Sequence, residues 1–293
     1  MTTLAPIQLL ETWLIRENRA AYMEWLPSWR HAIASGRQQD LFLTFGLAGR
    51  RLSRLDLHLT DSDRAAAESA CPGWDPCDLR FAEAARLLLL LDVAGSGGDF
   101  AATFQSLCAT ADVSEAVTLY RGLPLYPDPA SLHWQVGEGL RTSIEAVFTA
   151  IAHRNPFPRA QFDEARWNHM VLKALFLGVP LAPIQGFDAR RNPELALIAA
   201  RYADERRAAG RAIPPELWRC VGPFATGALF DTVAGRASST NMQERVAVAL
   251  ALQESPDARV PAILAGLPEE NRLIRAGLVS WSTLGSLPVQ EAA

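Results

Sequence analysis

The chain has 293 residues, of which 49% are hydrophobic, so it is long enough to bury a sizeable core. Its formal net charge is −4, with 28 basic against 32 acidic residues, which leaves no basic excess for binding a nucleic acid. The longest apolar runs fall short of the roughly 20 residues that span a bilayer, so we expect no transmembrane segment. The N-terminus lacks the basic region of a secretory signal, and we expect a cytoplasmic protein.

Apolar residues recur at helical spacing along the whole chain, and no strand-like alternation lasts beyond four residues. Helix-start signals, which are capping side chains or prolines, stand in chain order at Thr60 or Asp61, Asp75-Pro76, Asp99, Asp128-Pro129, Asn192-Pro193, Pro214-Pro215, Ser239 or Thr240, and Ser255-Pro256. Gly210 fits the position just past a helix end. The pattern predicts an all-α fold of roughly ten to thirteen helices.

Short helices joined by Pro, Gly and Asp links predict an irregular α-solenoid or bundle of antiparallel helix pairs. From about residue 239 onward the pattern is typical of degenerate HEAT-type hairpins, although no exact repeat period is present. The most linker-like stretch, residues 91–100, is short enough to join two helices of one domain. We therefore expect a single all-helical domain over residues 1–293.

Known cofactor and metal motifs are missing from the sequence. The four cysteines and five histidines show no zinc-binding spacing, and there is no phosphate-binding glycine loop. Cys71 and Cys77 alone lie close together, which leaves a disulfide or a metal clip open beside an incidental pair. We expect no metal and no cofactor.

Lys173 is the only lysine of the chain, and it stands in an apolar segment, residues 167–181. On a helix over residues 164–178, Arg166, His169 and Lys173 share an arc of about 60° at about 100° per residue. This cationic stripe either faces water or lines a cleft, where it holds an anionic or carbonyl-bearing group. In a cleft, Lys173 is a candidate catalytic amine, because burial shifts its pKa and it can form a Schiff base.

Asn168 lies on the apolar side of the same helix, so its amide is either hydrogen-bonded in the core or lines a polar pocket. It is the second candidate catalytic residue. In the following loop, Asn192 is most simply a helix N-cap, while Asp188 forms an ion pair with Arg190 or Arg191. Alternatively the loop and Lys173 hold a phosphate or carboxylate. The candidate substrate-binding residues are Arg166, His169, Asp188, Arg190 and Asn192.

Three strings carry a resemblance to a known family: NPFPRAQFDEARWNHMVLKALFLGVPL, GFDARRNPELALIAARYADERRAAGR and PPELWRCVGPF. Together they resemble the central signature of the EboA family, most specifically over residues 155–224. Asn168 and Lys173 fit the family pattern, whereas His169 stands where relatives have glutamine.

The resemblance implies a role in a pathway. EboA proteins are encoded in small bacterial clusters beside a UbiA-type prenyltransferase, a TatD-like hydrolase, a sugar-phosphate-cyclase-like protein and a TIM-barrel protein. These clusters are associated with making or moving a secondary metabolite, including export of a sunscreen-pigment precursor. The implied function is an accessory protein that binds a small polar or anionic intermediate of prenylated, indole or cyclitol type, with other ebo-cluster proteins as partners. The alternatives are a metal-independent enzyme around Lys173 and a HEAT-like protein–protein adaptor.

Overall fold

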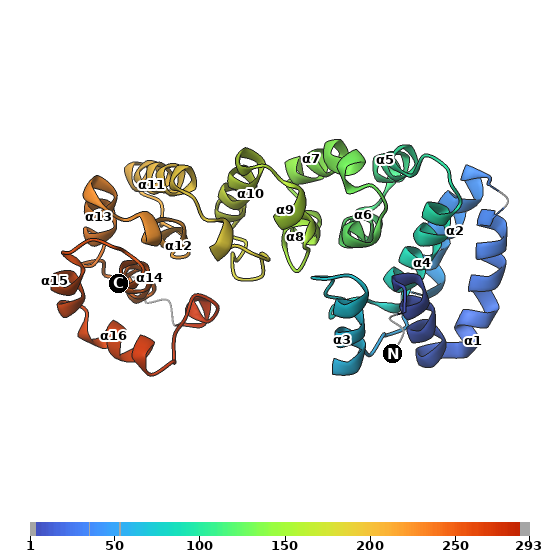
Figure 1. The fold of residues 1–293 in the computed structure, drawn as a ribbon, viewed down its shortest axis with the longest axis horizontal. Coiled ribbons are helices and arrows are strands. Elements are labelled where there is room, and N and C mark those ends of the chain that lie inside the picture. The colour runs from blue at the N-terminus through green and yellow to red at the C-terminus, as the bar shows by residue number, and fades with distance from the viewer. Residues whose placement is uncertain (1–3, 35, 53, 288–293) are drawn as a thin grey trace. The chain divides into compact units, whose positions relative to one another are not determined.

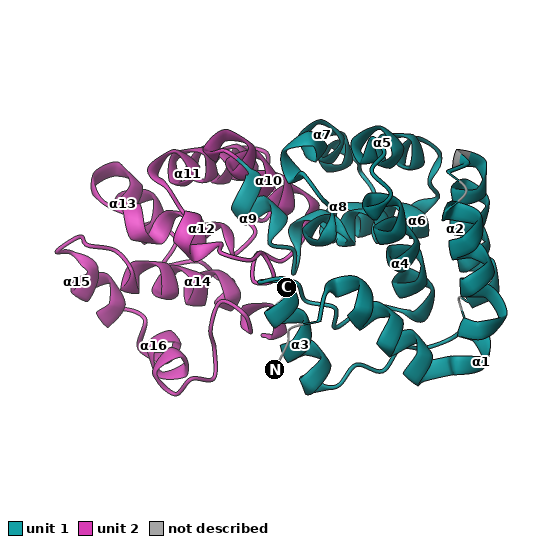
Figure 2. Ribbon diagram, turned by 45° about the vertical axis from the view of Figure 1, so that its right-hand side comes forward, with its two compact units in different colours: residues 1–162 teal, residues 163–293 magenta. Residues whose placement is uncertain are grey.

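The computed structural model describes residues 4–34, 36–52 and 54–287. In this part of the chain every regular element is a helix, with 16 α-helices, five short 3₁₀-helices and no strand (Figure 1). The all-α prediction is confirmed. None of the described helices combines the length and apolar character that crossing a membrane requires. Contacts divide the chain into two compact units, residues 1–162 and 163–293 (Figure 2). The expectation of one domain over the whole chain stays a prediction.

Unit 1 is built around α4, whose residues Leu87, Leu88, Leu89 and Leu90 have no exposed surface. Helix α4 packs against α1, α2 and α6, and α6 packs against α8. The elements of this unit are α1 (Pro6–Ala34), α2 (Gln38–Leu52), α3 (Asp61–Ala70), α4 (Phe81–Gly95), α5 (Phe100–Thr110), α6 (Val113–Arg121), η1 (Leu123–Leu125), η2 (Pro129–Leu132), α7 (His133–Arg141), α8 (Glu145–Ala152) and α9 (Phe157–Gln161).

Unit 2 is built around α14, which packs against α12, α13, α15 and α16, while α11 packs against α12. Gly222 lies where the chain following α12 meets α14, and a Cβ on it would come within 2.7 Å of the Ala251 carbonyl oxygen. The elements are α10 (Glu164–Leu177), η3 (Asp188–Arg190), α11 (Pro193–Ala208), α12 (Leu217–Val221), η4 (Gly222–Phe224), α13 (Gly227–Ala234), α14 (Met242–Gln253), α15 (Val260–Ala265), α16 (Pro268–Arg275) and η5 (Leu284–Ser286). The HEAT-type character of this region stays a prediction.

Several helix starts lie where the sequence places them. The side chains of Thr60, Asp99 and Asn192 each accept a hydrogen bond from a backbone N–H in the first turn of the following helix. Gly210 follows the end of α11 with a φ of 65°, a conformation that favours glycine. These caps are local interactions, which is why the sequence alone predicts them.

Other helix starts differ from the prediction. The helix expected after Asp75-Pro76 begins only at Phe81, because the Asp75 carboxylate accepts the Cys77 N–H and so caps a turn. The long helix expected after Asp128-Pro129 is split into η2, α7 and α8, with a break at Thr142. Helices α9 and α12 have five residues each and α15 has six, too short to show an apolar period, which is why the sequence predicts too few helices.

Candidate ligand-binding site

Helix α10 carries most of the residues that the sequence singles out. The Asp163 side chain accepts the Arg166 N–H at 2.8 Å and begins the helix, and Gly178 ends it with a φ of 73°. Trp167, Met170 and other apolar residues of α10 are completely buried. The helix is therefore fixed at both ends and along its apolar face.

The cationic stripe lies on the less buried side of α10. Arg166 and Lys173 are half-buried and His169 is exposed. Burial lowers the pKa of the Lys173 ammonium from its ordinary value, because the charged form loses hydration. The three residues thus share a face, as the helical geometry predicts, and differ in exposure.

The single lysine makes this pKa directly measurable. Reductive methylation with ¹³C-formaldehyde labels only Lys173 and the N-terminal amine, and we expect the Lys173 resonance to titrate at lower pH in the folded than in the urea-unfolded protein. Between the two pKa values the unfolded chain binds more protons, so this group makes folding stability rise with pH. If the Lys173 resonance titrates at the same pH or at a higher pH in the folded than in the unfolded protein, the burial of Lys173 is contradicted.

Asn168 is 4% exposed and pairs with a second asparagine. Its Nδ2 donates to Asn192 Oδ1 at 3.2 Å, and Asn192 Nδ2 donates back to Asn168 Oδ1 at 2.8 Å. Asn192 Oδ1 also accepts the Leu195 N–H at 2.8 Å, which begins α11. The amide pair therefore joins the middle of α10 to the start of α11.

A cluster of charged side chains, which we call the arginine network, consists of Asp188, Arg191, Arg219 and Glu254. Arg219 donates from Nε and Nη2 to the two Asp188 oxygens at 3.0 and 2.8 Å. Arg191 Nη2 lies 2.7 Å from Glu254 Oε2, and its Nη1 donates to the Arg219 carbonyl at 3.0 Å. Both guanidinium groups are about nine-tenths buried. The network ties η3, α12 and the end of α14 together.

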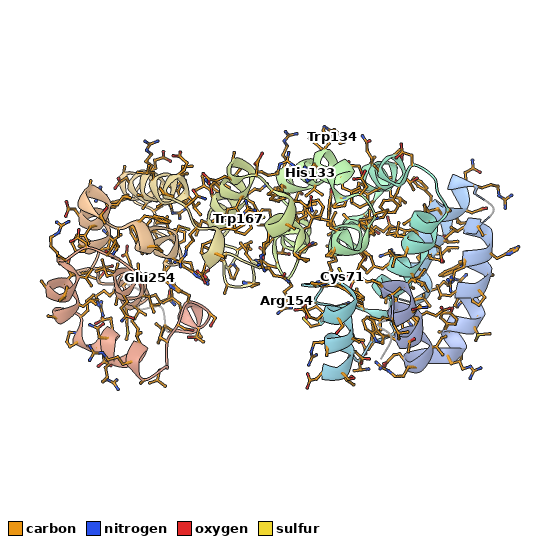
Figure 3. The ribbon with its side chains drawn as sticks, in the orientation of Figure 1. Cys71, His133, Trp134, Arg154, Trp167 and Glu254 are labelled. Carbon is orange, nitrogen blue, oxygen red and sulfur yellow. The ribbon has the colours of Figure 1, made fainter. Side chains whose placement is uncertain are left out.

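The loop ion pair expected at Asp188 is present, since Arg191 Nε lies 3.5 Å from Asp188 Oδ1, but the bidentate partner is Arg219. Arg190 instead lies over the Trp167 ring, with its guanidinium carbon 4.6 Å from the ring centroid. Trp167 is labelled in Figure 3. Burial lowers the pKa of Arg190 from its ordinary value. Sequence reasoning missed Arg219 and Glu254 as partners because both lie far along the chain from Asp188.

Unit 2 contains a cavity of about 540 Å³, which we call the unit 2 cavity. Its walls come from the end of α10 and the loop after it, from the link between α11 and α12, from the start of α14, and from the segment around η5. The residues that line it are Leu175, Gly178, Val179, Pro180, Ala182, Arg206, Ala212, Ile213, Pro214, Pro215, Glu216, Asn241, Gln243, Trp281, Ser282, Leu284 and Gly285. None of the residues proposed from the sequence is among them.

Glu216 connects this cavity to the arginine network. Its Oε2 accepts the Leu181 N–H at 2.9 Å, while its Oε1 is buried without a hydrogen bond and lies 4.0 Å from Arg219 Nη1, which is also buried without one. Burial raises the pKa of the Glu216 carboxyl. Trp281, another lining residue, donates from Nε1 to Glu254 Oε1 at 3.2 Å. The network therefore reaches the cavity at two points.

The raised pKa of Glu216 has a defined effect on stability. Because the folded state binds the proton more tightly than the unfolded chain, wild-type stability falls as pH rises from the ordinary glutamate pKa through the raised one. Glu216→Gln removes this titration, so chemical denaturation over that pH range should show the wild type losing stability relative to the variant. If the free energy of unfolding changes with pH in the same way in both proteins, the burial of the Glu216 carboxyl is contradicted. Glu205→Gln, on the exposed side of α11, serves as control.

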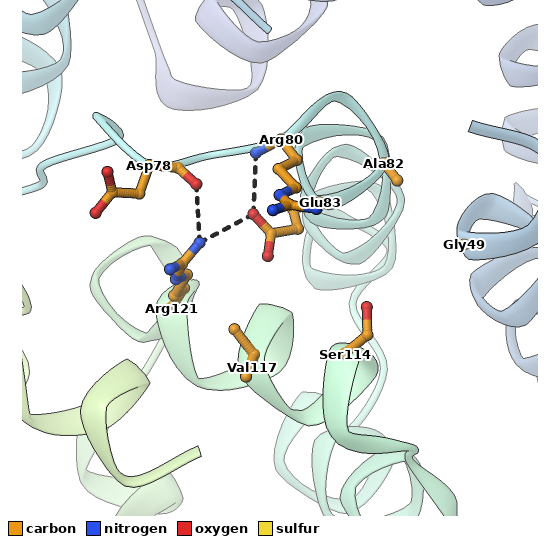
Figure 4. A pocket seen from close by; sticks show the side chains of 8 residues that line it. All are labelled: Gly49, Asp78, Arg80, Ala82, Glu83, Ser114, Val117 and Arg121. Carbon is orange, nitrogen blue, oxygen red and sulfur yellow. Dashed lines mark hydrogen bonds and ion pairs between the residues drawn. The ribbon is translucent and has the colours of Figure 1, made fainter. Parts of the chain in front are cut away.

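Unit 1 contains a second cavity, of about 580 Å³, lined by Gly49, Asp78, Arg80, Ala82, Glu83, Ser114, Val117 and Arg121 (Figure 4). Glu83 and Arg121 form an ion pair, and the Asp78 carboxylate pairs with Arg154, which is not a lining residue. Arg121 Nη1 donates to the Asp78 carbonyl and to Glu83 Oε2, both at 3.0 Å, and Glu83 Oε2 also accepts the Arg80 N–H. These bonds hold the start of α4 against α6, so the groups in this cavity have a structural role.

The fold and the unit 2 cavity define an all-helical protein with a pocket of the size that small molecules occupy, roughly 300–1,000 Å³. A family model described as metabolite traffic protein EboA matches residues 6–222, and the chain belongs to this family. Searches of curated proteins and of solved structures returned no match. The matched region includes α10 and the arginines of the network, whereas Gln243, Glu254 and Trp281 lie beyond it.

Proposed function

We propose that this protein is an accessory protein of a metabolite pathway and that it binds a small-molecule intermediate in the unit 2 cavity. The observation that carries the proposal is the cavity itself, about 540 Å³ in volume and lined by apolar side chains with a few polar groups. Such a lining is typical of small-molecule sites. The family description, metabolite traffic protein, supports a role in handling a metabolite.

The cellular setting is part of the same proposal. We place the protein in the cytoplasm, in a secondary-metabolite pathway, with other ebo-cluster proteins as partners. The support for this setting is the resemblance of residues 155–224 to the family signature and the match over residues 6–222. The candidate residues Arg166, His169, Asp188, Arg190 and Asn192 do not line the cavity. In this proposal Asp188, Arg190 and Asn192 act indirectly, through their contacts with Arg219, Trp167 and Asn168.

Native mass spectrometry with cell extract tests the binding proposal. Gly285 lines the cavity, and a Cβ on it meets no atom within 4 Å, so a side chain can start here and Gly285→Phe should occupy part of the cavity. Gly98 has the same open surroundings but lies in the link between α4 and α5. We expect the wild type and Gly98→Phe to retain a small molecule that Gly285→Phe loses.

The opposite results are equally informative. If the three proteins give identical spectra with no bound molecule, the binding proposal is wrong and the protein–protein adaptor becomes the better account. If Gly285→Phe retains the molecule as well as the wild type, the ligand binds elsewhere. Far-ultraviolet circular dichroism of the three proteins confirms that the variants are folded.

One observation favours an enzyme that uses Lys173. Burial lowers the pKa of its amine, which increases the unprotonated fraction that attacks a carbonyl carbon. Attack followed by loss of water forms an imine, with Asn168 positioning α10 through its bond to Asn192. Borohydride treatment with cell extract should then add a stable mass to the wild type and none at this position to Lys173→Met. Equal modification of both proteins would exclude this alternative.

A further inference from the structure

We propose that the unit 2 cavity takes a largely apolar molecule without negative charge, and that Glu216 excludes anions from it. This inference rests on the proposed function, since it names the chemical class of the ligand for the same cavity. The ligand proposed here differs from the polar or anionic intermediate that the sequence and its family resemblance imply.

The walls of the cavity are mainly apolar. Rigid or branched side chains without charge supply most of the surface, and they come from three separate segments: Val179 and Pro180, Ile213, Pro214 and Pro215, and Trp281 and Leu284. A ligand gains free energy by removing such surface from water, about 25 cal/mol per Å². An ionised group facing these walls loses hydration without an equivalent partner.

The one cation among the lining residues, Arg206, has neutral hydrogen-bond partners. Arg206 donates from Nη1 to the Tyr202 hydroxyl at 2.9 Å and from Nε to the Ala212 carbonyl. Its guanidinium carbon also lies 5.6 Å from the centroid of the Tyr202 ring. These bonds hold the side chain against the link after α11.

Glu216 supplies the one acidic group of the lining. The Leu181 N–H fixes its Oε2, and the nearest guanidinium, Arg219, gives its two hydrogen bonds in bidentate form to Asp188. The cation beside Glu216 is therefore shared with another carboxylate. A bound anion would meet the Glu216 carboxylate at short range in a partly buried site, where repulsion between like charges is weakly screened.

Neutral polar groups complete the site. Asn241 and Gln243 both line the cavity. Asn241 Oδ1 accepts the Gln243 N–H, and Gln243 Nε2 donates to the Leu287 carbonyl. Among the described residues, no hydrogen bond uses Asn241 Nδ2 or Gln243 Oε1. One uncharged donor and one uncharged acceptor are thus present for a hydroxyl, amide or carbonyl group of a ligand.

Two probes of nearly equal shape test the charge preference. 2-Naphthamide is neutral and 2-naphthoate is an anion at pH 7.5, and isothermal titration calorimetry measures both against the full chain. We expect the amide to bind the wild type and the carboxylate to bind about tenfold more weakly. In Glu216→Gln the difference between the two probes should shrink to about twofold. Gly285→Phe should bind neither probe, while Gly98→Phe should bind both as the wild type does.

Each other result overturns a defined part of the account. If the carboxylate binds the wild type as tightly as the amide and Gly285→Phe abolishes both, the ligand class is wrong and the cavity remains the binding site. If the preference persists unchanged in Glu216→Gln, Glu216 does not exclude anions. If neither probe binds, or if Gly285→Phe binds both, the cavity is not a ligand site and the proposed function fails with the inference.

Discussion

Replacing Arg219 by methionine should lower the free energy of unfolding of unit 2 by about 2 kcal/mol. The guanidinium makes two hydrogen bonds to Asp188 and lies over the Phe187 ring, with its carbon 4.8 Å from the ring centroid. Methionine keeps much of the packing but leaves Asp188, whose side chain is 52% exposed, with only Arg191, and it leaves the buried Glu216 Oε1 with no cation beside it. The loss should exceed that of a pair exposed on both sides, because the buried Glu216 oxygen stays poorly hydrated.

Urea denaturation followed by circular dichroism measures the effect, with Arg207→Met as the matched control. Arg207 pairs with Asp204 on the surface of α11, at a distance of 2.9 Å, and both side chains are more than half exposed. Exposed pairs contribute at most about 1 kcal/mol, so the control should stay close to the wild type. Equal losses for the two variants would show that the arginine network does not stabilise unit 2.

Gly222→Ala should destabilise unit 2 by about 2–3 kcal/mol. The added Cβ would lie 2.7 Å from the Ala251 carbonyl oxygen and 3.0 Å from the Ala251 Cα, which are backbone atoms of the central helix α14. A flexible side chain could turn away from the new methyl group, whereas a helix backbone must shift as a whole.

Thermal unfolding of Gly222→Ala and Gly98→Ala provides the measurement. A Cβ on Gly98 meets no atom within 4 Å, so this control should change stability by no more than about 0.5 kcal/mol. A Gly222→Ala variant as stable as the wild type would mean that α12 and α14 do not approach each other as closely as the structure shows.

Much of the fold is predictable from the sequence because local rules decide it. The apolar period gives the all-α class, and the Thr60, Asp99 and Asn192 caps lie where their side chains predict. Helix α10 follows the same logic, from its Asp163 cap to Gly178. The errors fall where a tertiary or turn interaction competes, as at Asp75, whose carboxylate binds a turn N–H.

The candidate site is less predictable, since its parts come together only in three dimensions. Helical spacing correctly puts Arg166, His169 and Lys173 on one face, and it marks Asn168 as a buried polar residue. No local pattern indicates that Arg219 binds Asp188, 31 residues earlier, or that Trp281 donates to Glu254. The walls of the cavity come from segments that are far apart in the chain, and in the sequence the prolines and glycines of these segments indicate only turns.

The central claim is that a small molecule binds inside the unit 2 cavity, and hydrogen–deuterium exchange with mass spectrometry locates such binding. The wild type is compared in buffer and with the extract fraction that native mass spectra show to bind. Our account predicts slower exchange in the cavity walls, residues 178–182, 212–216 and 281–285, with unit 1 unchanged. Unchanged exchange in these walls, or protection confined to residues 4–162, would contradict it.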